Sequence, residues 1–166
     1  MICRHNAICD TLYNLASTAC LAPICEKAGL LGDAPGRRPG DIYIPAWHTS
    51  SLAIDLAVTC PLQSKYKSVQ DTAADHYAKN VNHADYDVGF IGTNIEFCAA
   101  VVDSFGSWSA EGLEVITEII SRGAKRLLSD PHRYTATAWQ QLACVLQIHN
   151  SGMVISRTVP PDSNIT

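Results

Sequence analysis

The spacing of apolar residues predicts alternating helices and strands along the chain. Apolar positions recur every three to four residues in segments expected to form helices, and runs of strand length separate these segments. The expected helices cover residues 6–20, 68–83, 107–128 and 130–148, the last continuing as far as about 155. The expected strands cover residues 24–27, 41–47, 52–60 and 96–105. The predicted order is therefore α-β-β-β-α-β-α-α.

This order predicts an α/β protein with a mixed four-stranded sheet and extra C-terminal helices. The 166 residues suffice for one domain with its own core, which we expect to span 1–157, followed by a flexible tail at 158–166. Hydrophobic residues make up 47% of the chain, a globular composition. No apolar stretch approaches the roughly 20 residues of a membrane span, and no signal peptide is visible, so no membrane association is expected.

Two acidic residues stand in the second and third expected strands. Asp41 begins the run Asp41-Ile42-Tyr43-Ile44, and Asp55 lies inside the apolar run Leu52 to Thr59. A carboxylate among apolar strand residues is costly unless something binds it. Two such groups on a hairpin can share a hard divalent cation, Mg²⁺ or Mn²⁺, with the backbone carbonyl of Leu56 as a third ligand and Glu26 as a further candidate. This pattern predicts a metal-dependent nuclease.

A lysine that positions the attacking water is expected near such a metal. The position two residues after the second acid is Ala57, so the simple D-x-K pattern is absent. Lys79, on the following helix, is the predicted replacement.

Net charge sets a limit on how such a domain meets DNA. The chain carries a formal charge of −4, whereas a domain that grips DNA unaided usually has a basic excess. Local basic residues are nevertheless predicted to meet phosphate: Arg37, Arg38, Lys65 and Lys67. Three residues of the first helix are predicted to contact DNA or orient the site, with helix capping and packing as the alternative: Arg4, His5 and Asn6.

Seven scattered cysteines, without a CxxC pair, favour free thiols in a reducing compartment. The alternative is that Cys3 or Cys9 binds a metal whose other ligands lie outside this chain.

Several stretches, spread over residues 4–157, resemble the PD-(D/E)XK nuclease superfamily. The likeness is closer to the restriction-like endonuclease domain of non-LTR retrotransposon reverse-transcriptase proteins. The stretches that carry it are Arg4-His5-Asn6 with Asp10, Gly29-Leu30-Leu31, Arg37 to Asp41, Asp55 to Leu62, Lys79, and Val101 to Trp108. The acid in the first motif follows Pro39-Gly40, where the family has Pro-Asp.

The resemblance implies a restriction-endonuclease-like αβββαβ core with the acids on its second and third strands. It implies a Mg²⁺- or Mn²⁺-dependent DNA endonuclease that nicks a target site, with Asp41 and Asp55 as ligands and Lys79 as the catalytic lysine. Expected partners are double-stranded or branched DNA, the reverse transcriptase and zinc-knuckle domains of a parent polyprotein, and a second copy in a homodimer. The expected location is intracellular, in the nucleus.

Three alternatives stay open. A catalytically degenerate domain of the same fold would bind DNA or protein, as the Pro39-Gly40-Asp41 run and the acidic charge favour. A Holliday-junction-resolvase-like homodimeric nuclease would prefer branched DNA. A purely structural domain would satisfy a buried Asp55 with hydrogen bonds alone.

Overall fold

The structure is a computed structural model that describes residues 2–31, 34, 36–67, 70–127 and 130–158. It is a mixed α/β protein with a four-stranded mixed sheet, as predicted. The strands are β1 (Ile24–Cys25), β2 (Ile42–Trp47), β3 (Ser50–Thr59) and β4 (Ile95–Asp103). The helices are α1 (Ile2–Thr18), α2 (Ala73–Tyr77), α3 (His83–Phe90), α4 (Ala110–Leu127) and α5 (Pro131–Thr158). Two shorter turns are η1 (Ser64–Tyr66), which is 3₁₀, and η2 (Ala78–Asn82), which is π-helical.

The strands follow one another across the sheet in the order β1-β2-β3-β4. β2 and β3 form the predicted antiparallel hairpin, in which Ile42 lies opposite Ile54. β3 and β4 are parallel, with Asp55 opposite Ala99. β3 is therefore an inner strand, and half of its residues are buried and the other half partly buried, which explains its nearly continuous apolar sequence.

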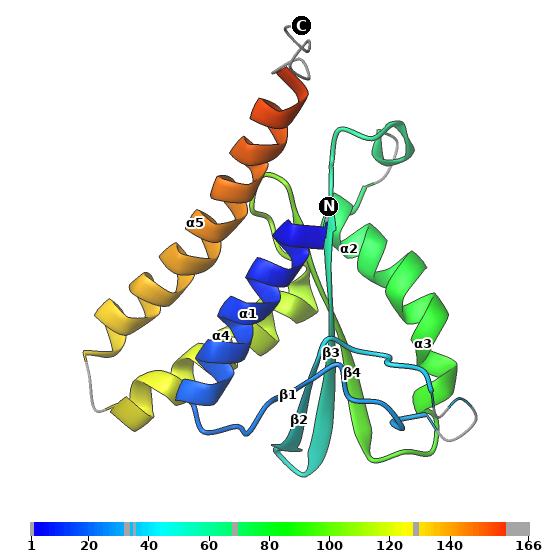
Figure 1. Ribbon diagram of the computed structural model, residues 1–166. Helices are drawn as coiled ribbons and strands as arrows, with labels where there is room; N and C mark the ends of the chain where they lie inside the picture. Colours follow the sequence, from blue (N-terminus) through cyan, green and yellow to red (C-terminus); the bar gives the residue numbers. More distant parts are fainter. Residues whose placement is uncertain (1, 32–33, 35, 68–69, 128–129, 159–166) are drawn as a thin grey trace, which may run out of the picture.

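Helices cover both faces of the sheet (Figure 1). On one face α1, α4 and α5 pack on alternate residues of β2 and β3, including Ile42, Leu52 and Ile54. On the other face α2, η2 and α3 form one continuous helical segment. This segment packs through small side chains, Ala74 and Ala78, against Ala99 and Val101 of β4. The alternation of strand side chains places Asp55 on this second face, between Ala53 and Ala57.

The helical segment differs from the predicted helix in its ends and its interior. It begins at Ala73, after Thr72, whose hydroxyl accepts a hydrogen bond from the Asp75 N–H, and it runs to Phe90 rather than 83. The predicted start at Ser68 lies outside the described residues. The π-helical turn at 78–82 changes which side chains face the sheet, and such turns are frequent at functional sites.

Two local interpretations of the sequence need correction. The sequence also predicts that Pro45 ends the second strand, but β2 continues to Trp47 through an irregular register after Ile44. A proline lacks the N–H that a regular ladder needs, so the pairing shifts there instead of stopping. At the other end of the chain, α5 continues to Thr158, beyond the predicted limit of about 155 and one residue into the expected tail; residues 159–166 lie outside the described residues.

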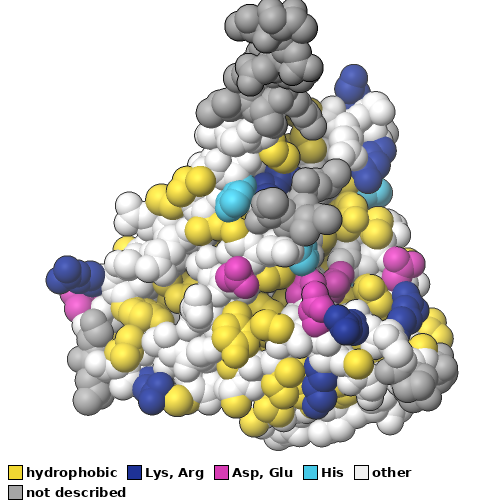
Figure 2. Space-filling model, in the orientation of Figure 1, with side chains coloured by type: hydrophobic (Ala, Val, Ile, Leu, Met, Phe, Trp, Pro, Cys, Tyr) yellow, Lys and Arg dark blue, Asp and Glu magenta, His cyan; other side chains and the backbone are white. Residues whose placement is uncertain are grey.

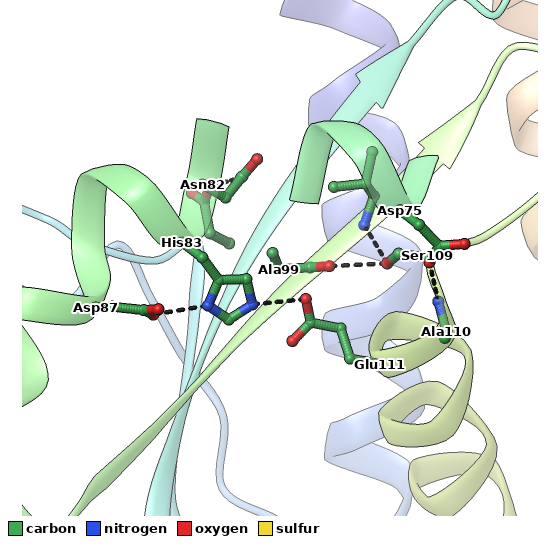
Figure 3. Close-up of polar contacts among 10 residues, drawn as sticks. Asp75, Asn82, His83, Asp87, Ala99, Ser109, Ala110 and Glu111 are labelled. Atoms are coloured by element: carbon green, nitrogen blue, oxygen red, sulfur yellow. Dashed lines mark hydrogen bonds and ion pairs between the residues drawn. The ribbon is translucent and has the colours of Figure 1, made fainter. Parts of the chain in front are cut away.

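The helical segment is tied to α4 along β4, which is an edge strand. His83 donates through Nδ1 to Asp87 (2.6 Å) and through Nε2 to Glu111 in the first turn of α4 (2.7 Å). The carboxylate of Asp75 accepts a hydrogen bond from the N–H of Ala110, the first residue of α4 (2.7 Å). These contacts, drawn in Figure 3, hold the helical segment in place beside Asp55's face of the sheet. Among the described residues, no helix combines the length and apolar character needed to cross a membrane.

Candidate metal centre

Asp41 lies immediately before β2 and reaches across to β3. Its Oδ2 accepts a hydrogen bond from the N–H of Leu56, 2.7 Å away. Gly40 makes this approach possible, because a Cβ at that position would lie 3.1 Å from the carbonyl oxygen of Ile54. The close passage of Gly40 against β3 therefore brings the Asp41 carboxylate to the residue that follows Asp55.

Asp55 is partly buried and accepts a hydrogen bond from Nδ2 of Asn82, the last residue of the π-helical turn. Burial raises the pKa of Asp55 to about 6, and the negative charge of Asp41 adds to the rise. The Asp41 carboxylate therefore approaches β3 at Leu56, the residue that follows Asp55.

A cavity of about 470 Å³ opens beside Asp55. The start of α1, the second half of β3 and the helical segment form its walls. The lining residues are Arg4, His5, Asn6, Asp55, Leu56, Ala57, Val58, Tyr77, Val81, Asn82, Asp85 and Tyr86. The predicted residues of the first helix and the second acid therefore share one cavity, which has the position and size of a small binding site.

Five of the lining residues were not singled out from the sequence: Tyr77, Val81, Asn82, Asp85 and Tyr86. A signal for Asp85 was present, because it continues the four-residue spacing of Tyr77 and Val81. No comparable signal marks Asn82, whose orientation depends on the π-helical turn.

His5 connects the first helix to Asp41. Its Nε2 donates to Asp41 Oδ2 at 3.1 Å, and its Nδ1 donates to the side-chain oxygen of Asn6 at 3.2 Å. The thiol sulfur of Cys9, one helical turn along, lies 3.7 Å from Nε2. The hydrogen bond to Asp41, followed by that to Cys9, raises the pKa of His5 to about 11 against the opposing effect of burial. Without a metal, His5 is therefore an imidazolium paired with Asp41.

Lys79 lies away from this cavity. It is exposed on the π-helical turn, and the lining residues do not include it. The position after Leu56 is Ala57, which does line the cavity. Among the described lining residues, the basic side chains are Arg4 and His5. The structure thus leaves the predicted catalytic lysine outside the cavity that Asp55 lines.

The predicted DNA-contacting residues fall into two groups. Arg4 is buried and donates to Oδ1 of Asn150 in α5 (2.7 Å), so it connects two helices. Arg38 forms an exposed ion pair with Glu26, so the carboxylate of Glu26, a candidate metal ligand, is engaged by an arginine. These contacts give the side chains of Arg4, Arg38 and Glu26 partners other than the two acids.

Arg37 and Lys65 instead flank the cavity. The Arg37 guanidinium lies 5.0 Å from the ring centre of Tyr86, and the Lys65 ammonium lies 5.2 Å from that of Tyr77. Both tyrosines line the cavity. Lys67 is exposed nearby in sequence. Figure 2 shows acidic side chains gathered in the middle of this face, with Lys and Arg side chains beside them.

The oxygen atoms of Asp41, Asp55 and their neighbours are suitable ligands for a hard divalent cation. Both acids supply carboxylate oxygens, the ligands that Mg²⁺ and Mn²⁺ prefer. The N–H of Leu56 points toward Asp41, and in a strand the carbonyl of the same residue points to the same side. The buried Oδ1 of Asn82 has no hydrogen-bond partner among the described residues. A cation would also relieve the repulsion between the two acids.

No protein-family model matches this sequence, and the search of curated proteins also found no match.

Proposed function

We propose that this protein is a divalent-metal-dependent DNA endonuclease domain with a restriction-endonuclease-like core. The observation that carries the proposal is the hydrogen bond from the Leu56 N–H to Asp41, which brings the Asp41 carboxylate to the strand residue next to Asp55. The mixed sheet, with the acids beside its second and third strands, supports the same conclusion. A target-site nicking role in a retrotransposon-type protein rests on the motif resemblance alone.

Asp41, Asp55 and the carbonyl of Leu56 would hold Mg²⁺ or Mn²⁺. When bound, the metal supplies a Lewis acid for the phosphate oxygen and lowers the pKa of a coordinated water. Asn82 donates to Asp55 and so orients its carboxylate. Because Asp55 has a pKa of about 6, it must lose its proton to bind a cation, and metal binding is expected to strengthen as pH rises through 6.

Arg37 and Lys65, beside the cavity, would bind the DNA backbone. Each lies over a tyrosine of the cavity wall, which holds a flexible cation near the entrance. Because the whole chain has a charge of −4, we propose that strong DNA affinity depends on neighbouring domains of a parent polyprotein.

Nicking of supercoiled plasmid in Mn²⁺ tests the proposal. We expect wild-type protein to convert the plasmid to the open circle and Asp55→Ala to lose this activity. Asp71→Ala is a matched control, since Asp71 is an exposed aspartate outside the cavity. Equal nicking by wild type and Asp55→Ala, or none by either, would contradict the assignment.

A second candidate is a non-catalytic binding module of the same fold. The absence of any lysine among the described residues lining the cavity favours it. Titration with Mn²⁺ separates the two functions, because a protein that binds metal in its folded state is stabilised by it. A melting temperature that rises with Mn²⁺ in wild type but not in Asp55→Ala supports the nuclease; no rise in either supports the binding module.

A further inference from the structure

His5, Cys9 and Asp41 place three different ligand types around one point. Their ligand atoms all lie within 4.8 Å of one another, and each side chain is partly buried. His5 Nε2 lies 3.1 Å from Asp41 Oδ2 and 3.7 Å from Cys9 Sγ. Tetrahedral zinc, with bonds of about 2.0 Å to nitrogen and oxygen and about 2.3 Å to sulfur, separates its ligand atoms by roughly 3.3–3.5 Å. Cys9 Sγ is also 3.8 Å from His5 Nδ1, so the Cys9 side chain must rotate toward the Nε2 side of the ring to complete the site.

The groups around the cluster already orient two of its members. Asn6 offers a carbonyl oxygen to His5 Nδ1, and an oxygen can only accept, so Nδ1 carries the proton and Nε2 faces the cluster. The Leu56 N–H in turn holds the Asp41 carboxylate. Histidine and carboxylate ligands of metals are typically held by such outer hydrogen bonds, which fix their orientation.

The spacing of residues along α1 brings the third ligand, Cys9, to His5. His5 and Cys9 are four residues apart in α1, so they project from the same side of the helix. α1 packs against the sheet through Ile8 and Leu12, which brings this side of the helix to the start of β2. The thiol and imidazole therefore meet Asp41 through the same packing that builds the core.

The donor set differs in kind from that of the proposed nuclease metal. Magnesium prefers oxygen ligands, whereas a thiolate and an imidazole select Zn²⁺ and similar transition metals. Three protein ligands with one position left for water is a common zinc arrangement. Binding would displace the thiol proton of Cys9 and the Nε2 proton of His5.

We propose that His5, Cys9 and Asp41 form a Zn²⁺ site of this protein. The site links α1 to the segment before β2 and takes all its protein ligands from this chain. It shares Asp41 with the proposed Mg²⁺ site, so the two ions compete for that carboxylate. If the proposed nuclease function holds, Zn²⁺ therefore inhibits Mg²⁺-dependent nicking.

Cobalt substitution tests the site directly. Co²⁺ replaces Zn²⁺ in tetrahedral sites, and a thiolate ligand produces a charge-transfer band in the near ultraviolet together with intense visible bands. We expect both in wild-type protein titrated with Co²⁺ and their loss on adding Zn²⁺. Cys9→Ser should lose the charge-transfer band and bind Zn²⁺ at least about tenfold more weakly.

Cys144→Ser is the matched control, because Cys144 is an exposed thiol on α5. The control should keep the full spectrum and Zn²⁺ affinity of wild type. Identical spectra for wild type and Cys9→Ser, or no charge-transfer band in either, would overturn the proposal. Far-ultraviolet circular dichroism of Cys9→Ser checks that the variant is folded, and His5→Gln provides a second variant with the same expected loss of Zn²⁺ affinity.

The outcome for zinc is separable from the outcome for nuclease activity. Cobalt bands lost in Cys9→Ser establish the zinc site even if no variant nicks DNA. Nicking without such bands supports the nuclease and rejects the zinc site. Where both are present, Zn²⁺ should inhibit nicking by wild type more strongly than nicking by Cys9→Ser.

Discussion

Two histidines on helices, His5 and His83, each contact a carboxylate, but the other groups around the two rings differ. His5 contacts Asp41 through Nε2 and Asn6 through Nδ1, and the Cys9 sulfur lies 3.7 Å from Nε2 and 3.8 Å from Nδ1. His83 directs its two nitrogens to two carboxylates, Asp87 and Glu111. The ring nitrogens of an imidazole point in divergent directions, so the partners of His83 cannot approach one ion together (Figure 3).

The comparison shows that composition alone does not define a metal site. Both clusters combine a histidine with acidic groups, but only the His5 cluster brings three ligand atoms to one point, among the described residues. The His83 cluster instead joins α3 to α4 on opposite sides of β4. We therefore assign ligand binding to the first cluster and helix positioning to the second.

The largest expected difference concerns the two carboxylates nearest these histidines. Asp41→Asn keeps an oxygen that accepts the Leu56 N–H but removes the charge, so it should abolish both Mn²⁺ stabilisation and the cobalt charge-transfer band. Nicking should fall by about 100-fold or more, since several kcal/mol of metal-derived stabilisation are lost. Glu111→Gln is the matched change in the His83 cluster and should keep all three properties. A similar loss in both variants would remove the distinction between the clusters.

A second difference appears in the pH dependence of metal-free protein. The Asp55 pKa rises from 3.8 to about 6 on folding, so the native state holds this proton more tightly and loses stability as pH rises through that window. Asp55→Asn should lack the decline and be more stable than wild type near neutral pH by on the order of 2–3 kcal/mol. Urea unfolding in a chelator at several pH values measures this, with Asp71→Asn as the exposed control. An unchanged profile would contradict the assigned burial of Asp55.

A smaller effect on stability is expected in the His83 cluster. Burial lowers the pKa of His83, but its bonds to Asp87 and Glu111 outweigh this effect and raise the pKa overall. The raised pKa means that the stabilisation is fully present below the unfolded value of 6.5 and is lost as pH rises above it.

His83→Gln should therefore lower the free energy of unfolding by about 1 kcal/mol at mildly acidic pH, because both contacts are partly exposed. Denaturant unfolding measures this, with the exposed His132→Gln as control. Loss of cobalt binding in His83→Gln would show that the two clusters are not independent.

The smallest effect concerns Lys79. Since it is exposed and outside the cavity lining, Lys79→Ala should change nicking by less than about tenfold, below the usual contribution of a general acid or base. Lys125→Ala, an exposed change on α4, is the comparison. A loss of 100-fold or more at Lys79 alone would restore the catalytic role that the sequence predicts for it.

Local patterns were sufficient for much of the fold. Apolar spacing located the strands, and the hairpin around His48 was predicted because both its arms carry apolar runs. Proline was misleading at Pro45, where the strand accommodates it by a shift in register. The end of the central helical segment was also missed, since tertiary packing of Phe90 extends the helix beyond its clear periodicity.

For the site, the sequence identified the two acids but did not predict which side chains surround them. The cost of burying a carboxylate marked Asp55, and its hairpin partner Asp41 followed from strand order. The spacing of His5 and Cys9 was visible, but their meeting with Asp41 joins residues 36 positions apart and depends on how α1 packs on the sheet. The position of Asn82 over Asp55, across 27 positions, depends in the same way on a π-helical turn.

The sequence by itself determined the class of elements, their order and the two acids on neighbouring strands, because periodicity and burial cost act over a few adjacent residues. Only the tertiary structure decided which groups lie around those acids. It placed His5 and Asn82 in the cavity beside Asp55, brought Cys9 to His5 and Asp41, and left Lys79 outside the cavity lining, because these positions depend on the packing of helices against the sheet. Packing of segments distant in the chain is not encoded in any short pattern.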